Sequence, residues 1–125
     1  MLLNILKKEK IDMKIKDLIG EDEELVSIDN KSLDIIEKFF HNYEEYYKVA
    51  SIEKVLFGDD VHFIVQLFGG KNGNGDWNDY LFHLNKIFAS EYYKKFGVEN
   101  IWLIQLINDC IDDVHDVYVG LSLKE

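Results

Sequence analysis

The sequence predicts an α+β domain in which about three main helices pack on a small, largely antiparallel sheet of about three strands. Two patterns predict this class. In three segments, apolar residues recur every three or four positions, which is the spacing of one helix face. In other segments they alternate with their neighbours, which is strand spacing. The 125 residues, 47% of them hydrophobic, suit one compact domain spanning residues 1–125.

The N-terminal part of the sequence has no clean period. Residues 2–19 mix short apolar pieces with lysines and predict one or two short helices, and EDEE at 21–24 predicts a charged loop or a helix start. Asp29 and Asn30 are residue types that commonly cap a helix N-terminus. A first amphipathic helix is expected after them, with an apolar stripe formed by Leu33, Ile36, Phe40, Tyr43, Tyr47 and Ala50.

A β-hairpin is expected next. Residues 52–57 and 61–68 flank Gly58, Asp59 and Asp60, whose residue types favour a tight turn. Along 61–68, both sets of alternating residues are nearly equally apolar. We therefore expect this strand inside the sheet, covered on both faces. Residues 117–123 alternate in the same way and predict a third strand.

One long segment is rich in glycine: GGKNGNGDWND, residues 69–79. A nucleotide-binding loop does not fit, because Lys71 precedes the later glycines and no Ser or Thr follows it. A calcium loop does not fit either, because Trp77 stands where such a loop requires glycine. An exposed turn is favoured, in which Asp76 or Asn78 caps a second helix from Asp79 to Phe96, ended by Gly97.

A third helix is expected to begin near Glu99 or Asn100 and to include residues 101–115. At about 100° per residue, Ile104, Ile107, Ile111 and Val114 would share one side of it. Four aspartates would share the opposite side, namely Asp109, Asp112, Asp113 and Asp116. Pairs of them four residues apart repel each other, which favours a cationic partner, although a solvated face is the alternative. Cys110 and His115 would point away from the aspartates, so a zinc site is not expected.

Composition restricts the classes of partner. The chain has 14 basic and 24 acidic residues and a net charge of −10, and every basic residue is a lysine. An acidic chain without arginine is poorly suited to nucleic acid and to anionic lipid, so a basic protein partner is favoured. Acidity that serves only solubility is the alternative. A single cysteine, with neither a signal peptide nor a membrane span recognisable, predicts a cytoplasmic protein.

One stretch carries a resemblance. In GGKNGNGDWNDYLFHL, glycine is followed by Asp76, Trp77 and Asp79 and then by a leucine-bearing helix, which resembles the inhibitory segment of barstar-type nuclease inhibitors. In that family, acidic and aromatic residues at a loop–helix junction plug a ribonuclease active site. More broadly, the chain is similar to the small acidic immunity proteins that neutralise bacterial contact-dependent or polymorphic toxins. The resemblance implies that a cognate toxin is the partner.

These observations predict a non-enzymatic acidic binding protein that neutralises a basic, nuclease-like toxin by occluding its active site. No catalytic residue, metal or cofactor is expected. The expected partner-binding residues are Asp76, Trp77, Asp79, Tyr80, Asp109, Asp112, Asp113 and Asp116. Two alternatives remain open. One is a small metal-dependent hydrolase using Asp112, Asp116 and His62 or His83, and the other is a phage DNA-mimic regulator.

Overall fold

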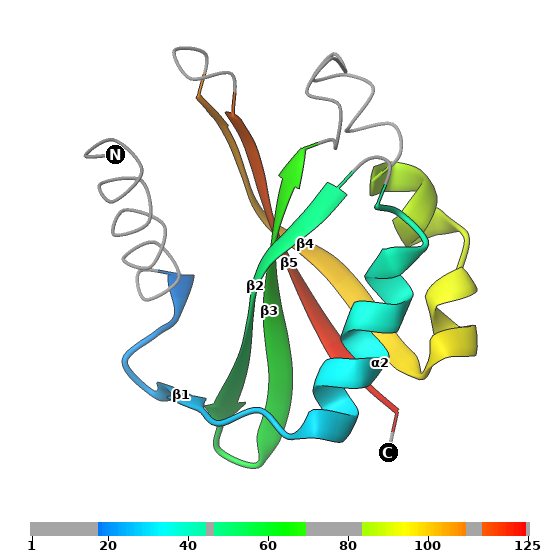
Figure 1. The fold of residues 1–125 in the computed structure, drawn as a ribbon. Helices are drawn as coiled ribbons and strands as arrows, with labels where there is room; N and C mark the ends of the chain where they lie inside the picture. Colours follow the sequence, from blue (N-terminus) through cyan, green and yellow to red (C-terminus); the bar gives the residue numbers. More distant parts are fainter. Residues whose placement is uncertain (1–17, 45–46, 70–83, 110–113, 125) are drawn as a thin grey trace.

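The sheet dominates the structure. A computed structural model describes residues 18–44, 47–69, 84–109 and 114–124 (Figure 1). The elements in chain order are β1 (Glu23–Val26), α2 (Asn30–His41), β2 (Tyr47–Phe57), β3 (Asp60–Gly69), the 3-10 helix η1 (Tyr92–Phe96), β4 (Val98–Asp109) and β5 (Val114–Leu123). The five strands form one antiparallel sheet in the order β1-β2-β3-β5-β4. The prediction of three main helices on three strands is therefore wrong.

The predicted hairpin is present and longer than expected. β2 and β3 pair from Tyr47 opposite Gly69 to Phe57 opposite Asp60. β3 lies between β2 and β5, and its residues from Phe63 to Leu67 are buried. The expectation that this strand lies inside the sheet with both faces covered is thus confirmed.

The first predicted helix begins where expected and ends early. The Asp29 carboxylate accepts hydrogen bonds from the Ser32 backbone N–H at 3.0 Å and from the Ser32 hydroxyl at 2.8 Å, which caps the N-terminus of α2. The helix ends at His41, and the Asn42 side chain donates to the last carbonyl groups. Tyr47 and Ala50, expected on the helix stripe, instead belong to β2.

The second predicted helix is broken. Residues 84–89 are helical, and η1 follows after Ser90 and Glu91. Glu91 has φ +54, a left-handed conformation that no α-helix can continue through. The part of this prediction before residue 84 lies outside the described residues. In the described part of the chain, no helix is both long and apolar enough to cross a bilayer.

The third predicted helix does not exist, because β4 and β5 occupy its place. β4 contains a bulge between Leu103 and Gln105, where the pairing with β5 shifts by one residue. A bulge interrupts the alternation of side chains between the two faces of a strand. Ile101 packs against the core beside the helices, whereas Ile104, at the bulge, packs against the core on the other side of the sheet. Their helix-like spacing therefore does not mark one face, and the strand is rich in β-branched and aromatic residues.

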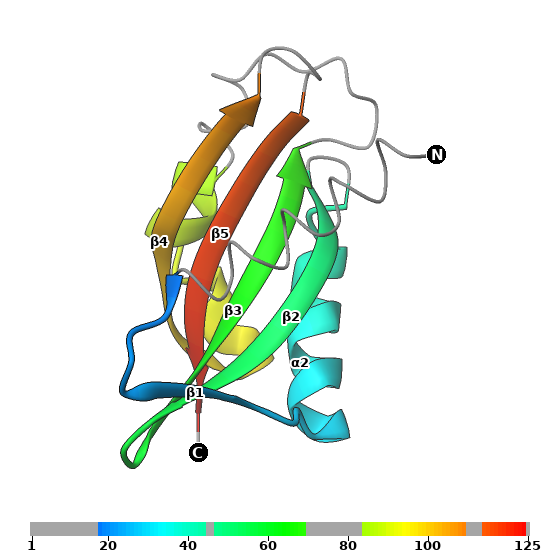
Figure 2. The ribbon, with the colours of Figure 1, turned by 90° about the vertical axis from the view of Figure 1, so that its left-hand side faces the viewer.

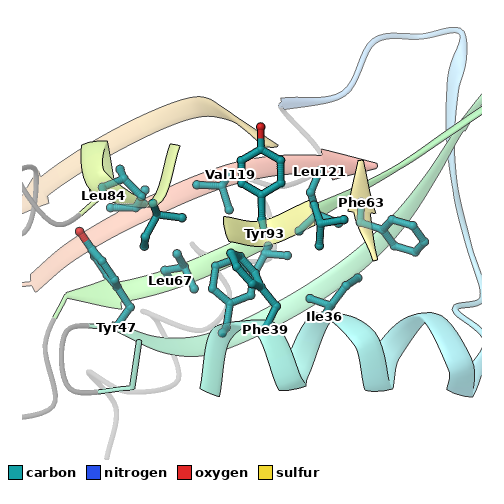
Figure 3. Packing of buried hydrophobic residues seen from close by; sticks show 14 residues of the cluster. Ile36, Phe39, Tyr47, Phe63, Leu67, Leu84, Tyr93, Val119 and Leu121 are labelled. Atoms are coloured by element: carbon teal, nitrogen blue, oxygen red, sulfur yellow. The ribbon is translucent and has the colours of Figure 1, made fainter. Parts of the chain in front are cut away.

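The main core lies between one face of the sheet and the helices, and we call this the helix face. Ile36 and Phe39 of α2 pack towards Phe63, Leu67, Val119 and Leu121 of the sheet, with Leu84 and Tyr93 beside them (Figure 3). On the opposite, second face, seen in Figure 2, Val55, Ile64 and Tyr118 are buried with Leu18, Ile19, Leu25 and Ile104. The sheet therefore supports a core on each side.

Candidate functional site

The sheet splits at one end. Pairing of β3 with β5 stops at Phe63 opposite Leu121, whereas β2 and β3 stay paired as far as Phe57 and Asp60. β4 and β5 likewise stay paired to Val98 and Leu123. A groove of about 610 Å³, the split groove, lies at this divergence. It is lined by Ser32, Lys54, Asp59, Asp60, Val61, His62, Phe63, Asn100, Trp102, Ser122, Leu123 and Lys124.

The β2–β3 turn places an aromatic ring and two carboxylates beside the split groove. Gly58 has φ +60 and Asp59 does not have a positive φ, the pattern of a type II′ turn with glycine at its first central position. The turn lies at the lower tip of the hairpin in Figure 1. Phe57 and Val61 flank it and remain 49% and 42% exposed. The turn therefore presents apolar surface and negative charge together.

β1 adds further negative charge beside this turn. Glu23 and Glu24 pair with Phe57 and Leu56 of β2, and Glu21 and Asp22 directly precede β1. We call the six acids at this position the acidic end: Glu21, Asp22, Glu23, Glu24, Asp59 and Asp60. Among the described residues, only Glu23 has a basic partner, because its Oε2 lies 3.5 Å from His62 Nε2. The other five carboxylates have no cationic partner within the described ranges.

The two lysines of the split groove are already engaged. Lys54 Nζ lies 3.6 Å from the Asp29 carboxylate, and Lys124 Nζ donates to the Lys94 carbonyl oxygen at 2.8 Å. Hydrogen bonds from the Ser32 hydroxyl and backbone N–H hold the pKa of the Asp29 carboxyl below its ordinary value. The Lys54–Asp29 pair contributes no net charge, and Lys124 keeps its positive charge, so Asp59 and Asp60 leave the groove with a net charge of −1.

Trp102 forms the opposite wall of the split groove. It pairs across the sheet with Gly120, and its indole ring lies where a side chain at Gly120 would stand. The ring also approaches the His62 imidazole, with centroids 5.9 Å apart. Trp102 is 39% exposed. An indole that is held by neighbours and still faces solvent is the usual form of an aromatic anchor.

Exposed apolar side chains concentrate at this end. Among the described residues, the exposed large hydrophobic side chains are Val49, Phe57, Val61, Tyr92, Trp102 and Leu103. Phe57, Val61 and Trp102 surround the turn and the split groove. A second hollow of about 380 Å³, between α2 and the start of β2, has mixed charge from Glu37, His41, Glu44 and Lys48. It contains none of the six exposed hydrophobics except Val49, so it is the weaker candidate.

The prediction that four aspartates share one helix face is wrong, because strands occupy this part of the chain. Asp109 ends β4, where it pairs with Val114, and Asp116 lies in β5 opposite Ile107. The helix that would align these residues with Asp112 and Asp113 is absent, so the separation of apolar and acidic helix faces fails. Asp76, Trp77, Asp79, Tyr80, Asp112 and Asp113 lie outside the described residues, as does the barstar-like stretch apart from Gly69 and Leu84 at its two ends. Their role in binding stays a prediction.

The hydrolase alternative finds no metal-binding group in the described part of the chain. There, no three residues of His, Cys, Asp or Glu gather closely enough to hold an ion. His62 contacts Glu23 and Trp102, while His83 and Asp112 are not among the described residues. The hydrolase alternative therefore stays a prediction.

Sequence reasoning missed most of this site. The sequence pattern marks Asp59 and Asp60 only as turn residues and predicts a helix around Trp102. Two features of the sequence could have indicated the site. One is the run of acidic residues EDEE before the hairpin, and the other is a tryptophan that pairs with a glycine across two strands. The second signal requires the register of β4 and β5, which periodicity does not provide.

Comparison with known proteins yields no relative: no protein-family model, no curated protein and no solved structure matches the chain. Function is therefore inferred from the geometry of the chain itself.

Proposed function

We propose that this is an acidic binding protein without catalytic activity, and that the acidic end and the split groove bind a basic protein. The specific form that we propose is an immunity protein, which neutralises a basic, nuclease-like bacterial toxin by covering its active site. One observation carries the proposal. Exposed Phe57, Val61 and Trp102 lie beside carboxylates that have no cationic partner among the described residues.

The two kinds of side chain have different tasks in this proposal. A concentration of carboxylates raises the rate of encounter with a positive surface, roughly tenfold to a thousandfold at low salt. Exposed aromatic side chains provide the affinity, because burial of such anchors accounts for most of the binding energy at protein interfaces. Phe57 and Trp102 supply these anchors from different hairpins. A partner that fills the split groove would contact both hairpins at once.

The location also suits the occlusion of an active site. The β2–β3 turn projects at one end of the sheet, beyond the last pair of β3 with β5. A projecting acidic turn can enter a cleft that otherwise receives the phosphates of a nucleic acid. Because a nuclease cleft must be positively charged, the same feature that binds its substrate would bind the acidic end.

The test uses the basic protein encoded beside this chain's gene, expressed as an inactive variant. Calorimetry at 50 and 300 mM NaCl compares the unmodified chain with the double variant Asp59→Lys, Asp60→Lys. The matched control is Asp34→Lys, Glu37→Lys on exposed positions of α2, which makes the same change in net charge. We expect the turn variant to weaken binding at 50 mM by about a hundredfold and to reduce the salt dependence, with the control within about threefold.

Equal effects of the two variants would show that only net charge matters and would contradict the assigned site. Active toxin provides the functional readout. We expect the unmodified chain to abolish nuclease activity in vitro and the turn variant to require a large excess. Absence of binding to the neighbouring basic protein would contradict the immunity role.

A further inference from the structure

β4 is an open edge of the sheet. Among the described residues it pairs with β5 alone, at the end of the strand order. Between positions 99 and 105, the exposed side chains are Glu99, Asn100, Trp102, Leu103 and Gln105. This stretch is therefore accessible over more than half of the strand. Figure 2 shows β4 along one side of the sheet.

Alternation along the strands identifies the backbone groups that face outward. The two-residue turn makes Phe57 and Asp60 a hydrogen-bonded pair, and successive residues of an antiparallel strand bond to opposite sides. Following the register across β3 and β5, Trp102 directs its N–H and C=O towards β5. Ile101 and Leu103, the neighbours of Trp102, direct theirs away from the sheet. An incoming strand would find donors and acceptors there.

The edge lacks most of the usual protection against strand addition. Natural sheets protect their edges with lysine, proline, bulges or very short strands. β4 is 12 residues long and contains neither lysine nor proline, and its register shifts between Val98 and Asn100 and between Leu103 and Gln105 leave Asn100–Leu103 regularly paired with β5. The other edge strand, β1, has only 4 residues, and the part of β2 that β1 leaves uncovered carries Lys48. β4 is thus the edge suited to strand addition.

We propose that β4 binds an extended strand of the basic partner, which adds to the sheet as a sixth strand. The proposal rests on the proposed function, because it assumes a basic partner at the same end of the molecule. Charge identifies this occupant. β4 carries Glu99 and Asp109 and no basic residue, so a second copy of the chain, with net charge −10, would be repelled.

The two faces of the edge define the chemistry of the added strand. Trp102 lies on the second face, beside the split groove, whereas Leu103 is on the helix face and 43% exposed. Lysine or arginine side chains at alternate positions of the strand would lie over the Trp102 ring, on the β4 side of the split groove that Asp59 and Asp60 also line. Apolar side chains at the other positions would cover Leu103. The occupant is therefore a strand of alternating basic and apolar residues.

The probe for this proposal is a blocked octapeptide of alternating lysine and valine, with a glutamate–valine octapeptide as control. Leu103→Pro removes the outward N–H. It breaks no hydrogen bond to β5, because the N–H at this edge position points away from the sheet and proline is tolerated there. Leu103→Thr shortens the side chain and keeps the N–H. We expect Leu103→Pro to weaken binding of the lysine peptide by at least about tenfold and Leu103→Thr by less than about threefold. Equal affinities of the two variants would overturn strand addition.

Amide hydrogen exchange in the unmodified protein gives a second readout that does not depend on folding of the proline variant. We expect the amides of Ile101 and Leu103 to exchange at least about tenfold more slowly at saturating lysine peptide. Unchanged exchange would overturn the proposal, as would equal binding of the glutamate peptide. If the unmodified protein self-associates without peptide and Leu103→Pro abolishes this self-association, the occupant of the β4 edge is a second copy of the chain and the proposal is overturned.

The two proposals fail separately. In one outcome, the neighbouring basic protein binds, Asp59→Lys, Asp60→Lys weakens this binding, and Leu103→Pro binds it as tightly as Leu103→Thr does. Strand addition is then wrong, and the acidic binding site stands. If the lysine peptide protects the β4 amides while no basic protein partner binds, the edge is a strand acceptor and the immunity role is wrong.

Discussion

Gly120 shows how one residue determines the position of a functional side chain. It lies in β5 between Ile64 of β3 and Trp102 of β4, and a methyl group at this position would overlap the indole ring. The absence of a side chain lets Trp102 lie flat against the strand and reach towards His62. The anchor in the split groove therefore depends on a glycine in β5, the strand next to β3.

We expect Gly120→Ala to lower the free energy of unfolding by about 1–3 kcal/mol, because the added methyl group displaces the indole. The same substitution in a Trp102→Ala background should be neutral or stabilising by about 0.5–1 kcal/mol, since alanine suits a strand better than glycine once the clash is gone. Urea unfolding of the four proteins measures this coupling. Additive effects would show that the indole does not occupy the space above Gly120.

Asp29 determines where a helix starts and also responds to pH. Its carboxylate accepts hydrogen bonds from Ser32 and lies near Lys54, and the Ser32 side chain is the main cause of its lowered pKa. A carboxyl with a lowered pKa in the folded state stabilises the fold while it is ionised. This stabilisation is present above the ordinary pKa of aspartate, about 3.9, and is lost as the pH falls through the lower folded value.

We therefore expect Asp29→Ala to destabilise the protein at pH 7 and to have a smaller effect at pH 2.5. Urea titrations of both proteins at the two pH values measure the difference. Asp29→Asn is the control, because an amide can still accept the Ser32 hydrogen bonds but does not titrate in this range. A destabilisation by Asp29→Ala that grows towards acid pH would contradict the capping role.

At the scale of elements, α2 supplies the core with a cluster of aromatic rings centred on Phe39. Phe39 is fully buried, and its ring lies 4.9 Å from that of Phe40, 5.5 Å from that of Tyr43 and 5.7 Å from that of Phe96. These centroid distances fall within the range of favourable aromatic pairs. Phe39 thus joins the helix to the segment that leads into β4.

We expect Phe39→Ala to lower the free energy of unfolding by about 3–5 kcal/mol, through lost burial and the cavity left behind. Lys38→Ala, next to it on the solvent side, should change stability by at most about 0.5 kcal/mol, because its contact with Asp34 is an exposed ion pair. Chemical denaturation monitored by circular dichroism tests both. Similar effects of the two substitutions would show that Phe39 does not pack in the core.

The elements that sequence patterns predicted correctly are those with local signals. Asp29 with Ser32 identifies the start of α2, and glycine and aspartate identify the β2–β3 turn. The failures occur at register shifts. The bulges at Val49/Ser51 and Leu103/Gln105 interrupt alternation, so that Tyr47 and Ala50 in β2 and Ile104 and Ile107 in β4 show a three-residue spacing that is also typical of a helix face. Side-chain spacing alone cannot separate these cases, because the shift depends on the partner strand.

For the whole molecule, charge was predictable and its location was not. The sequence shows the net charge of −10 and the block of acids between residues 21 and 60. It does not show that β1 brings residues 21–24 beside Asp59 and Asp60, because that contact requires the pairing of Glu23 with Phe57. That acidic residues steer the partner and aromatic residues anchor it remains a proposal. The helix that was expected to carry the aspartates is absent, because β4 and β5 occupy its place.

We expect the melting temperature to rise as NaCl increases from 10 to 200 mM, because screening reduces repulsion among the carboxylates. Asp59→Lys, Asp60→Lys changes the net charge by +4, from −10 to −6, and should show a smaller rise. Thermal scans of the two proteins at equal concentration make the comparison. A melting temperature that falls with salt would indicate that attractive ion pairs outweigh repulsion.

The strand order has a consequence for synthesis on the ribosome. β5 follows β4 in the sequence and yet occupies the place between β3 and β4. While translation proceeds, β3 and β4 have no strand to join them, and Leu67, Val65 and Phe63 lack the β5 residues that cover their flank. The nascent chain therefore cannot complete its core until the last strand has emerged, so a chaperone that shields apolar segments would act on it up to that moment.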